Sequence, residues 1–293
     1  MHNVLLIEDN PGDARFIVEM IAEDPGAPFV LHTADRLSLG LEHLSAGSTG
    51  LVLLDLSLPD SFGLDTFAKV YAHSPTVPII VLTGNDDQML ALTAVKGGAQ
   101  DYLVKGRLDR ELLLRSMQYS IERKRYQVQL EHQANYDALT GLPNRNLLHD
   151  RLRQAVYSQR SPRNIAVVFM DLDHFKFVND SLGHAAGDEA LKALAAHVRD
   201  SLRPVDAVSR FGGEEFVVLL PGTPVEEGQQ VLTRLQRQLS ASLFMHQGRE
   251  VFVTFSAGIT AYRIGETIEQ ALDRADEALY EAKRTGKNRT CIG

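Results

Sequence analysis

Five short apolar runs, separated by longer stretches of helical character, occupy the first 106 residues of the chain. The runs cover residues 4–7, 29–31, 51–54, 78–82 and 102–104. Short continuous apolar runs are typical of parallel strands buried on both faces, and their alternation with helices predicts a doubly wound α/β domain with five strands. Reactive groups in such a domain collect where the carboxyl ends of the strands meet. Polar residues that directly follow an apolar run are therefore the candidates for a site in this half.

Charge is distributed unequally along the chain. Residues 1–106 hold 5 Lys and Arg against 14 Asp and Glu, whereas residues 107–293 hold 25 against 24. The overall charge of −8 argues against nucleic acid as a partner, because a duplex requires a basic face. The single cysteine, Cys291, excludes an intramolecular disulfide framework. With no basic and then apolar leader, and no apolar run near the roughly 20 residues of a membrane helix, we expect a cytoplasmic protein without membrane insertion.

A helical linker is predicted over residues 107–134. No proline or glycine occurs from Arg107 to Gln133, and charged residues alternate with apolar ones. Leu114, Ile121 and Val128 recur every seven residues, but the intervening partner positions become polar. A coiled coil and a solvated helix with one apolar stripe both remain open at this point.

The remaining residues, 135–293, follow a different pattern. A turn-rich segment at 137–145 opens it, and apolar strands are expected at 165–170, 216–220 and 251–260. Helices are expected near 145–160, 184–202, 225–241 and 267–284. This order predicts an α+β, ferredoxin-like (palm-type) domain. The chain is thus divided into a domain at 1–106, a linker at 107–134 and a second domain at 135–293.

Polar residues at the predicted strand ends of the first domain suggest phosphoryl chemistry. Glu8 and Asp9 follow the first run, Asp55 the third, Thr83 ends the fourth and Lys105 follows the fifth. Three carboxylates can hold Mg²⁺ beside a carboxylate nucleophile, for which Asp55 is the best candidate. The cation of Lys105 and the hydroxyl of Thr83 could then contact a phosphoryl group.

These residues resemble the response-regulator receiver family over essentially all of residues 1–106. The matching positions are Asp55 followed by Leu56-Ser57-Leu58-Pro59 and Gly63, with Thr83, Tyr102 and Lys105 at the family's relative spacing. The resemblance implies phosphorylation of Asp55 by a cognate histidine kinase. It also implies Mg²⁺ bound by Glu8, Asp9, Asp55 and the Ser57 carbonyl, and switch residues at Thr83, Tyr102 and Lys105. Gly106 departs from the family, which usually has a cis-proline there, so a cis bond is not expected. A receiver fold that is no longer phosphorylated is the alternative.

The second domain carries carboxylates at two strand ends. The first predicted strand leads into Asp171-Leu172-Asp173, and Gly212-Gly213-Glu214-Glu215 precedes the second. Two glycines permit a tight turn and the close approach of a ligand. If these strands pair, Asp171 and Glu214 face each other and can hold Mg²⁺ over a triphosphate.

Residues 135–293 resemble the GGDEF family of diguanylate cyclases. The matching motifs lie at residues 137–145, 171–180, 183–188, 212–216 and 280–286. The resemblance implies Mg²⁺ bound by Asp171, the Leu172 carbonyl and Glu214, with Glu215 near the metal or the attacking hydroxyl. Asn179 and Asp188 would read guanine, and a carboxylate can accept from guanine N1–H, which adenine lacks. The expected phosphate contacts are Lys283, Lys287, Arg210 and the backbone amides of His174, Phe175 and Lys176.

The family's reaction joins two GTP into cyclic di-GMP across a homodimer. Arg203 and Asp206 match the family's inhibitory RxxD motif, which would bind cyclic di-GMP, although an Arg and Asp three residues apart can also be a surface ion pair. The competing hypotheses are a degenerate domain that only binds a nucleotide, and an enzyme with altered base choice. Retention of Asp171, Glu214, Glu215 and Asp188 favours a guanine-specific cyclase.

Overall fold

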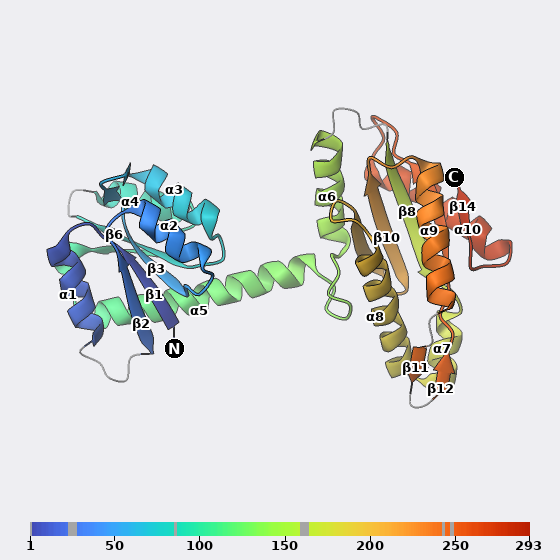
Figure 1. Ribbon diagram of the computed structural model, residues 1–293, viewed down its shortest axis with the longest axis horizontal. Coiled ribbons are helices and arrows are strands. Elements are labelled where there is room, and N and C mark those ends of the chain that lie inside the picture. The colour runs from blue at the N-terminus through green and yellow to red at the C-terminus, as the bar shows by residue number, and fades with distance from the viewer. Residues whose placement is uncertain (1, 23–27, 85–86, 159–163, 242–243, 247–248) are drawn as a thin grey trace. The chain divides into compact units, whose positions relative to one another are not determined.

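The computed structural model describes residues 2–22, 28–84, 87–158, 164–241, 244–246 and 249–293. The chain divides into two compact units, residues 1–131 and 132–293 (Figure 1). Within the described parts of the chain, no helix is both long and apolar enough to cross a bilayer.

The N-terminal unit contains the predicted parallel sheet, in the strand order β2-β1-β3-β6-β7. Its strands are β1 (His2–Ile7), β2 (Phe29–Ala34), β3 (Leu51–Asp55), β6 (Ile79–Thr83) and β7 (Asp101–Val104). The connecting helices are α1 (Pro11–Ala22), α2 (Leu37–Ser45), α3 (Leu64–His73) and α4 (Gln88–Lys96). The fold predicted for this half, doubly wound with five parallel strands, is confirmed.

Helices cover both faces of this sheet, which explains the continuous apolar runs (Figure 1). Leu5 and Ile7 of β1 pack in the cluster that includes α2, α3 and α4, whereas Val4 and Leu6 pack on the side of α1 and α5. Because successive side chains of a strand point to opposite faces, both sets of positions can be buried, and every residue of β3 and β6 is buried. The carboxyl ends of the strands are left free for polar residues.

The predicted linker begins with a short 3-10 turn, η1 (Lys105–Arg107), and continues as α5 (Arg110–Asn135). Leu113 and Met117 are buried in the N-terminal core, and Leu114 and Ile121 pack against it. Two of the three residues of the seven-residue repeat therefore contact their own domain and are not free to pair with another helix. A small hairpin, β4 (Ser57–Leu58) and β5 (Ser61–Phe62), follows β3. The described peptide bonds are all trans, which includes the bond after Lys105.

The C-terminal unit is built on a mixed sheet in the order β14-β13-β8-β10-β9, and the α+β prediction is confirmed. Its strands are β8 (Ile165–Leu172), β9 (Ala207–Gly212), β10 (Glu215–Pro221), β13 (Phe255–Ala261) and β14 (Thr290–Ile292), with a separate hairpin of β11 (Phe244–His246) and β12 (Arg249–Val251). The helices are α6 (Arg145–Ser158), α7 (Phe175–Leu182), α8 (His184–Ser201), α9 (Val225–Ser240) and α10 (Ile268–Arg284). The pairs among β13, β8, β10 and β9 are antiparallel, and β13 pairs with β14 in parallel.

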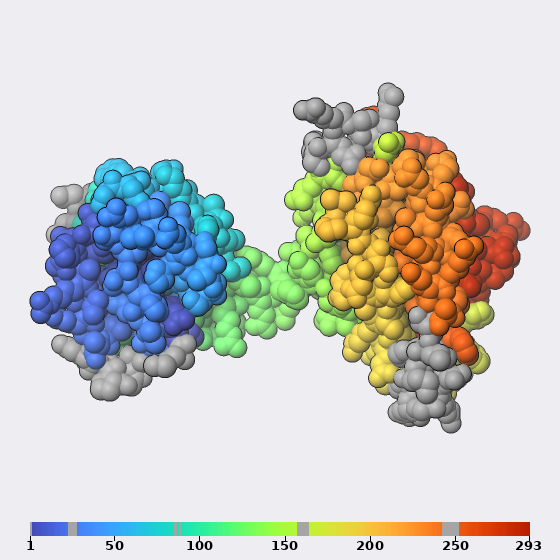
Figure 2. Space-filling model, in the orientation of Figure 1, coloured from blue at the N-terminus to red at the C-terminus, as the bar shows by residue number. Residues whose placement is uncertain are grey.

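Two apolar clusters hold this unit together. One joins the sheet to α8 and α9, which lie over one face (Figure 2), and the other joins it to α6 and α10. Helix α7 and strands β9 and β14 were not predicted from the sequence, and the predicted strand over 251–260 is interrupted at residues 252–254. The last residues of the helix predicted at 145–160 lie outside the described residues.

Candidate functional site

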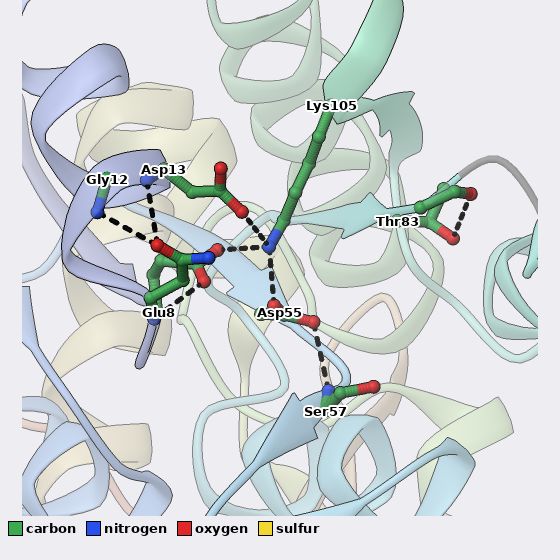
Figure 3. A network of polar contacts seen from close by, with 9 residues as sticks. Glu8, Gly12, Asp13, Asp55, Ser57, Thr83 and Lys105 are labelled. Carbon is green, nitrogen blue, oxygen red and sulfur yellow. Dashed lines mark hydrogen bonds and ion pairs between the residues drawn. The ribbon is translucent and has the colours of Figure 1, made fainter.

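The first candidate site lies at the carboxyl ends of β1, β3 and β7. Carboxylate oxygens of Glu8, Asp9 and Asp55 lie within 4.8 Å of one another. The Lys105 ammonium lies 2.6 Å from Asp55 Oδ2 and 2.6 Å from Glu8 Oε2 (Figure 3). It also lies 3.0 Å from Asp13 Oδ2, a contact that sequence analysis missed because Asp13 belongs to the first turn of α1 and not to a strand end.

The electrostatics of this pocket suit a cation. Burial raises the pKa of Glu8 to about 7, against the opposing effect of Lys105 and with a smaller contribution from the Asp55 charge. Burial alone would lower the pKa of Lys105, but its contacts with Asp55, Glu8 and Asp13 raise it. Glu8 Oε2 has no aligned hydrogen bond from any described residue, despite its short distance to the ammonium. Hard oxygen ligands and excess negative charge are the features that bind Mg²⁺ in proteins.

Ser57, Thr83 and Tyr102 are the other residues that the receiver resemblance indicated. The Ser57 backbone N–H donates to Asp55 Oδ1 at 2.9 Å, which fixes that carboxylate (Figure 3). The Thr83 hydroxyl donates to the Gly84 carbonyl at 3.2 Å. Tyr102 is partly buried against the cluster that contains α4. The contacts described for the Tyr102 ring and the Thr83 hydroxyl are therefore with residues other than Asp55.

The second candidate site lies where β8 and β10 pair in the C-terminal unit. The register places Glu215 opposite Asp171, so the expectation that Glu214 would occupy this position is wrong by one residue. This register is continuous from Glu215 opposite Asp171 to Pro221 opposite Ile165, so pairing along the full length of both strands sets it. On its other side β10 pairs with β9, and there the register shifts between Glu215 and Phe216, beside a turn in which Gly213 has φ of 49°. Glu214 still lies beside Asp171, since its carbonyl accepts from the Leu172 N–H at 3.3 Å.

A cleft of about 440 Å³ opens at this place. Its lining contains many of the residues that the motifs indicated, together with three that they did not assign, Asp173, Phe177 and Asp180. The lining residues are Asp171, Leu172, Asp173, His174, Phe175, Lys176, Phe177, Asp180, Glu214, Lys283 and Lys287. The tertiary structure thus brings segments from β8, α7, the β9–β10 turn and the end of α10 to one cleft.

Carboxylates in and beside this cleft repel one another. Burial, and next the charge of Asp171, raise the pKa of Glu214 and of Glu215. Burial also raises the pKa of Asp171, although Lys283 opposes this from 2.8 Å. Because a divalent cation would relieve this repulsion, and because its ligands would be carboxylate and carbonyl oxygens, the residues present fit Mg²⁺.

The start of α7 provides a place for phosphate. His174 has φ of 59° and ends the loop that follows β8, and no side chain of the described residues caps the first turn of α7. Free N–H groups at a helix N-terminus bind anions. Lys287 Nζ lies 3.4 Å from both ring nitrogens of His174, so the Lys287 cation also lies near the start of α7. The amides of Phe175 and Lys176 lie in this first turn.

The two predicted guanine contacts lie on α7 and at the start of α8. Asn179 Oδ1 is buried with no hydrogen-bond partner among the described residues. A Cβ at Gly187 would lie 2.0 Å from that oxygen, so glycine is required for α8 to approach α7 here. Asp188 follows directly and is exposed to solvent. The two residues are therefore adjacent, although neither lines the cleft itself.

Arg210 lies away from the cleft. Its guanidinium donates to both carboxylate oxygens of Asp137, at 3.0 and 3.1 Å, and to the Gly213 carbonyl, at 2.6 and 2.9 Å. Asp137 also accepts from Thr140, which closes the turn at the start of the domain. In this arrangement Arg210 braces the Gly-Gly turn against the segment that follows α5, instead of reaching toward a phosphate.

Arg203 and Asp206 form a closed pair at the start of β9. The largely buried Asp206 carboxylate accepts from the backbone N–H, Nε and Nη2 of Arg203 at 3.0, 3.0 and 2.7 Å. A cleft of about 450 Å³ lies beside this pair, and Arg151, Val205 and Pro221 contribute to its lining.

Comparisons with known proteins agree with the two-part organisation. The response regulator receiver domain model matches residues 4–117, and the diguanylate cyclase GGDEF domain model matches residues 134–289. The chain is 45% identical to the diguanylate cyclase DgcP of Pseudomonas aeruginosa over 190 residues, which cover 64% of this chain and 28% of DgcP. It is 29% identical to the response regulator PleD of Caulobacter vibrioides over 298 residues, which cover 97% of this chain and 64% of PleD.

A solved structure shows the same fold in the C-terminal unit. The coiled coil and GGDEF domain of DgcB from Caulobacter crescentus, determined in complex with c-di-GMP, matches with a TM-score of 0.57 and 28% identity, covering 62% of this chain and 98% of that one. The chain spans less than two thirds of the length of DgcP and of PleD. Since one family model covers more than half of the residues, the chain belongs to the GGDEF-domain family of diguanylate cyclases, and it carries a response regulator receiver domain on the N-terminal side.

Proposed function

We propose that the C-terminal domain condenses two GTP into cyclic di-GMP and releases two pyrophosphate. The observation that carries this proposal is one cleft lined by the carboxylates Asp171 and Glu214, by Lys283 and Lys287, and by the open start of α7. Carboxylates for a divalent cation and cations for a triphosphate are the two requirements for binding a nucleotide–metal complex.

Several groups in and beside the cleft have a role in this reaction. Lys283, Lys287 and the first N–H groups of α7 hold the phosphates, and Asp188 with Asn179 hold the guanine. Asp171, the Leu172 carbonyl and Glu214 would hold Mg²⁺, which when bound lowers the pKa of a hydroxyl and offsets charge at phosphorus. Glu215, whose pKa is raised by burial and by Asp171, is placed to receive a proton at its carboxylate.

Two copies of the domain are required, because each supplies one GTP. The 3′-oxygen of one GTP forms a bond to the α-phosphorus of the other, the bond from that phosphorus to the bridging oxygen breaks, and pyrophosphate leaves. A second such step closes the ring. The exposed side chains of Tyr119, Tyr126 and Leu130 on α5 support a homodimer through this helix. A monomer is expected to bind GTP and form no product.

The test is product formation from GTP and Mg²⁺ by the full chain. Glu214→Gln should lower kcat at least about a hundredfold, because a cation ligand at the reacting phosphate is lost. Glu277→Gln is the matched control, since Glu277 is exposed on α10 and does not line the cleft. Binding of GTP with no product from the wild-type dimer would indicate a nucleotide-binding module instead.

Base choice is tested at Asp188. Asp188→Asn replaces one of the two oxygens that can accept from guanine N1–H and its exocyclic amine with an NH2 donor, so the preference for GTP over ATP in kcat/KM should fall at least about tenfold. Chromatography of products from a GTP and ATP mixture measures this directly. An unchanged product ratio would assign guanine recognition to other residues.

We propose further that phosphorylation of Asp55 by a histidine kinase or a small phosphodonor activates the cyclase. The Asp55 carboxylate lies beside Lys105 and the acidic cluster, as a phosphoryl acceptor requires. Asp55→Asn should abolish the response to acetyl phosphate and leave basal turnover unchanged. Asp65→Asn, at an exposed surface pair with Lys69, is the control. A normal response of the Asp55 variant would refute this regulation.

Product inhibition through Arg203 and Asp206 is the third part of the proposal. Arginine presents a planar fork to phosphate or to a guanine edge, and the neighbouring cleft gives room for a purine. Arg203→Ala should raise the product concentration at which turnover slows. Arg199→Ala, which removes another exposed arginine–aspartate pair, is the matched control. If the Arg203 variant were inhibited by product as strongly as the wild type, the Arg203–Asp206 motif would be an ion pair without a role in inhibition.

A further inference from the structure

Asp173 is a buried carboxylate at the cleft to which the proposed reaction gives no role. Its side chain is held by three donors: Ser256 Oγ at 2.7 Å from Oδ1, and Thr254 Oγ1 at 2.9 Å and the Asn288 backbone N–H at 3.0 Å from Oδ2. Its own N–H donates to the Thr254 carbonyl at 2.8 Å. These three hydrogen bonds satisfy both oxygens and fix the orientation of the carboxylate.

The segment that Asp173 holds has an unusual backbone. After α10, Gly286, Lys287 and Asn288 have φ of 127°, 61° and 46°. A positive φ is disfavoured for residues with a Cβ, so Lys287 and Asn288 keep this conformation only where their surroundings hold them. The Asn288 N–H bond to Asp173 is one such contact, and it ties the turn to the end of β8, two residues after Asp171.

The same turn determines where the Lys287 ammonium lies. The Lys287 N–H donates to the Ala282 carbonyl at 3.0 Å, which fixes the residue at the end of α10. Its Nζ then lies 3.4 Å from the ring nitrogens of His174, which precedes the open first turn of α7. Asp173, which accepts the hydrogen bond from the turn, and His174, which the Lys287 ammonium contacts, are consecutive residues. Both contacts of the turn are therefore made to the same loop.

We propose that Asp173 is a positioning residue for triphosphate binding: it holds the Lys287–Asn288 turn so that the Lys287 ammonium lies over the N-terminus of α7. This inference rests on the proposed function, because the anion at that point is the phosphate chain of GTP. A role confined to tying β8 to β13, through Ser256 and Thr254, is the competing explanation. That role would support all ligands of the cleft equally.

The experiment measures binding of two nucleotides to the full chain with Mg²⁺ by calorimetry. The nucleotides are 3′-deoxy-GTP and 3′-deoxy-GMP, which lack the attacking hydroxyl and therefore do not turn over. Asp173→Asn and Lys287→Ala should each weaken binding of 3′-deoxy-GTP by about tenfold, the loss of one charge-assisted contact, and change binding of 3′-deoxy-GMP little. Lys192→Ala removes an exposed lysine of α8 outside the cleft and is the matched control.

A double-mutant cycle tests whether Asp173 affects nucleotide binding through Lys287. If Asp173 acts through Lys287, the double variant Asp173→Asn/Lys287→Ala should bind 3′-deoxy-GTP no more weakly than Lys287→Ala alone. Additive losses, or an equal loss for both nucleotides, would overturn the inference. If Asp173→Asn does not fold, Thr254→Val compared with Thr254→Ser removes one donor to the same carboxylate and must give the same selective loss.

Turnover of GTP by the wild-type chain distinguishes a failure of the proposed cyclase activity from a failure of the proposed positioning role of Asp173. If the wild type binds 3′-deoxy-GTP but forms no cyclic di-GMP, the proposed cyclase activity fails while the positioning role is still decided by the cycle. If the wild type makes product and Asp173→Asn binds both nucleotides normally, the positioning role alone fails.

Discussion

At the turn between β9 and β10, one arginine makes two kinds of contact. Arg210 forms an ion pair with Asp137 and also donates to the Gly213 carbonyl. Burial would raise the pKa of Asp137, but hydrogen bonds from Thr140 and Arg210 lower it. A carboxyl group with a lowered pKa in the folded state stabilises the fold above its unfolded pKa, and this contribution is lost as the pH falls through the folded value.

Asp137→Asn should therefore destabilise the C-terminal domain at pH 7 by about 1–2 kcal/mol, because a charge-assisted hydrogen bond is lost. The difference between wild type and variant should shrink as the pH falls below the ordinary Asp value of 3.8. Urea unfolding at several pH values measures this. Asp150→Asn, which removes an exposed partner of Arg153, is the control, and an equal effect of both substitutions would contradict the assigned role.

At the scale of elements, α5 is anchored to the N-terminal domain along its first half. Lys124 is 4% exposed, and its ammonium lies 5.5 Å from the centre of the Tyr71 ring on α3. Burial lowers the pKa of Lys124, with Glu131 opposing this. Tyr71 in turn packs on the loop before β7, where a Cβ at Gly98 would lie 3.0 Å from its ring. The helix is thus fixed to the domain at least as far as Lys124.

Lys124→Met is expected to stabilise the N-terminal domain at pH 7 by about 1 kcal/mol, because an unbranched side chain remains and a buried charge is removed. Since the folded pKa of Lys124 is lowered, the wild type should gain stability as the pH rises toward the ordinary lysine value of 10.5, and the advantage of the variant should fade. Thermal unfolding between pH 7 and 10 checks this. Lys69→Met, at an exposed position, is the control.

At the scale of the whole molecule, each unit has its own core. The N-terminal clusters and the residues packed against them extend up to Ile121, and the C-terminal ones begin at Leu139. Domains with separate cores unfold as separate cooperative units. A substitution in one core is therefore expected to act on one transition.

Leu53→Ala and Leu232→Ala test this, since both side chains are fully buried, one in each unit. Each should lower the stability of its own domain by about 2–5 kcal/mol through lost contacts and a cavity. Calorimetry should show one shifted transition for each variant. A shift of both transitions by either substitution would mean that the two cores unfold together.

How far the sequence predicts this protein depends on the range of the interactions involved. The parallel sheet was predictable because burial on both faces requires continuous apolar strands, and Glu8, Asp9, Asp55 and Lys105 were predictable because parallel strands end at one edge. Helix α7 and strand β14 were missed because each is short and gains its stability from packing and pairing with distant segments.

By itself the sequence determined the two domains, their fold classes and the motifs that identify the family, since these follow from local periodicity and residue type. Only the tertiary structure decided that Glu215 lies opposite Asp171, that Arg210 braces a turn, and that Asp173 holds the turn of Lys287. Strand register, ion-pair partners and positive backbone angles depend on segments that are remote along the chain, and no local pattern records how those segments meet.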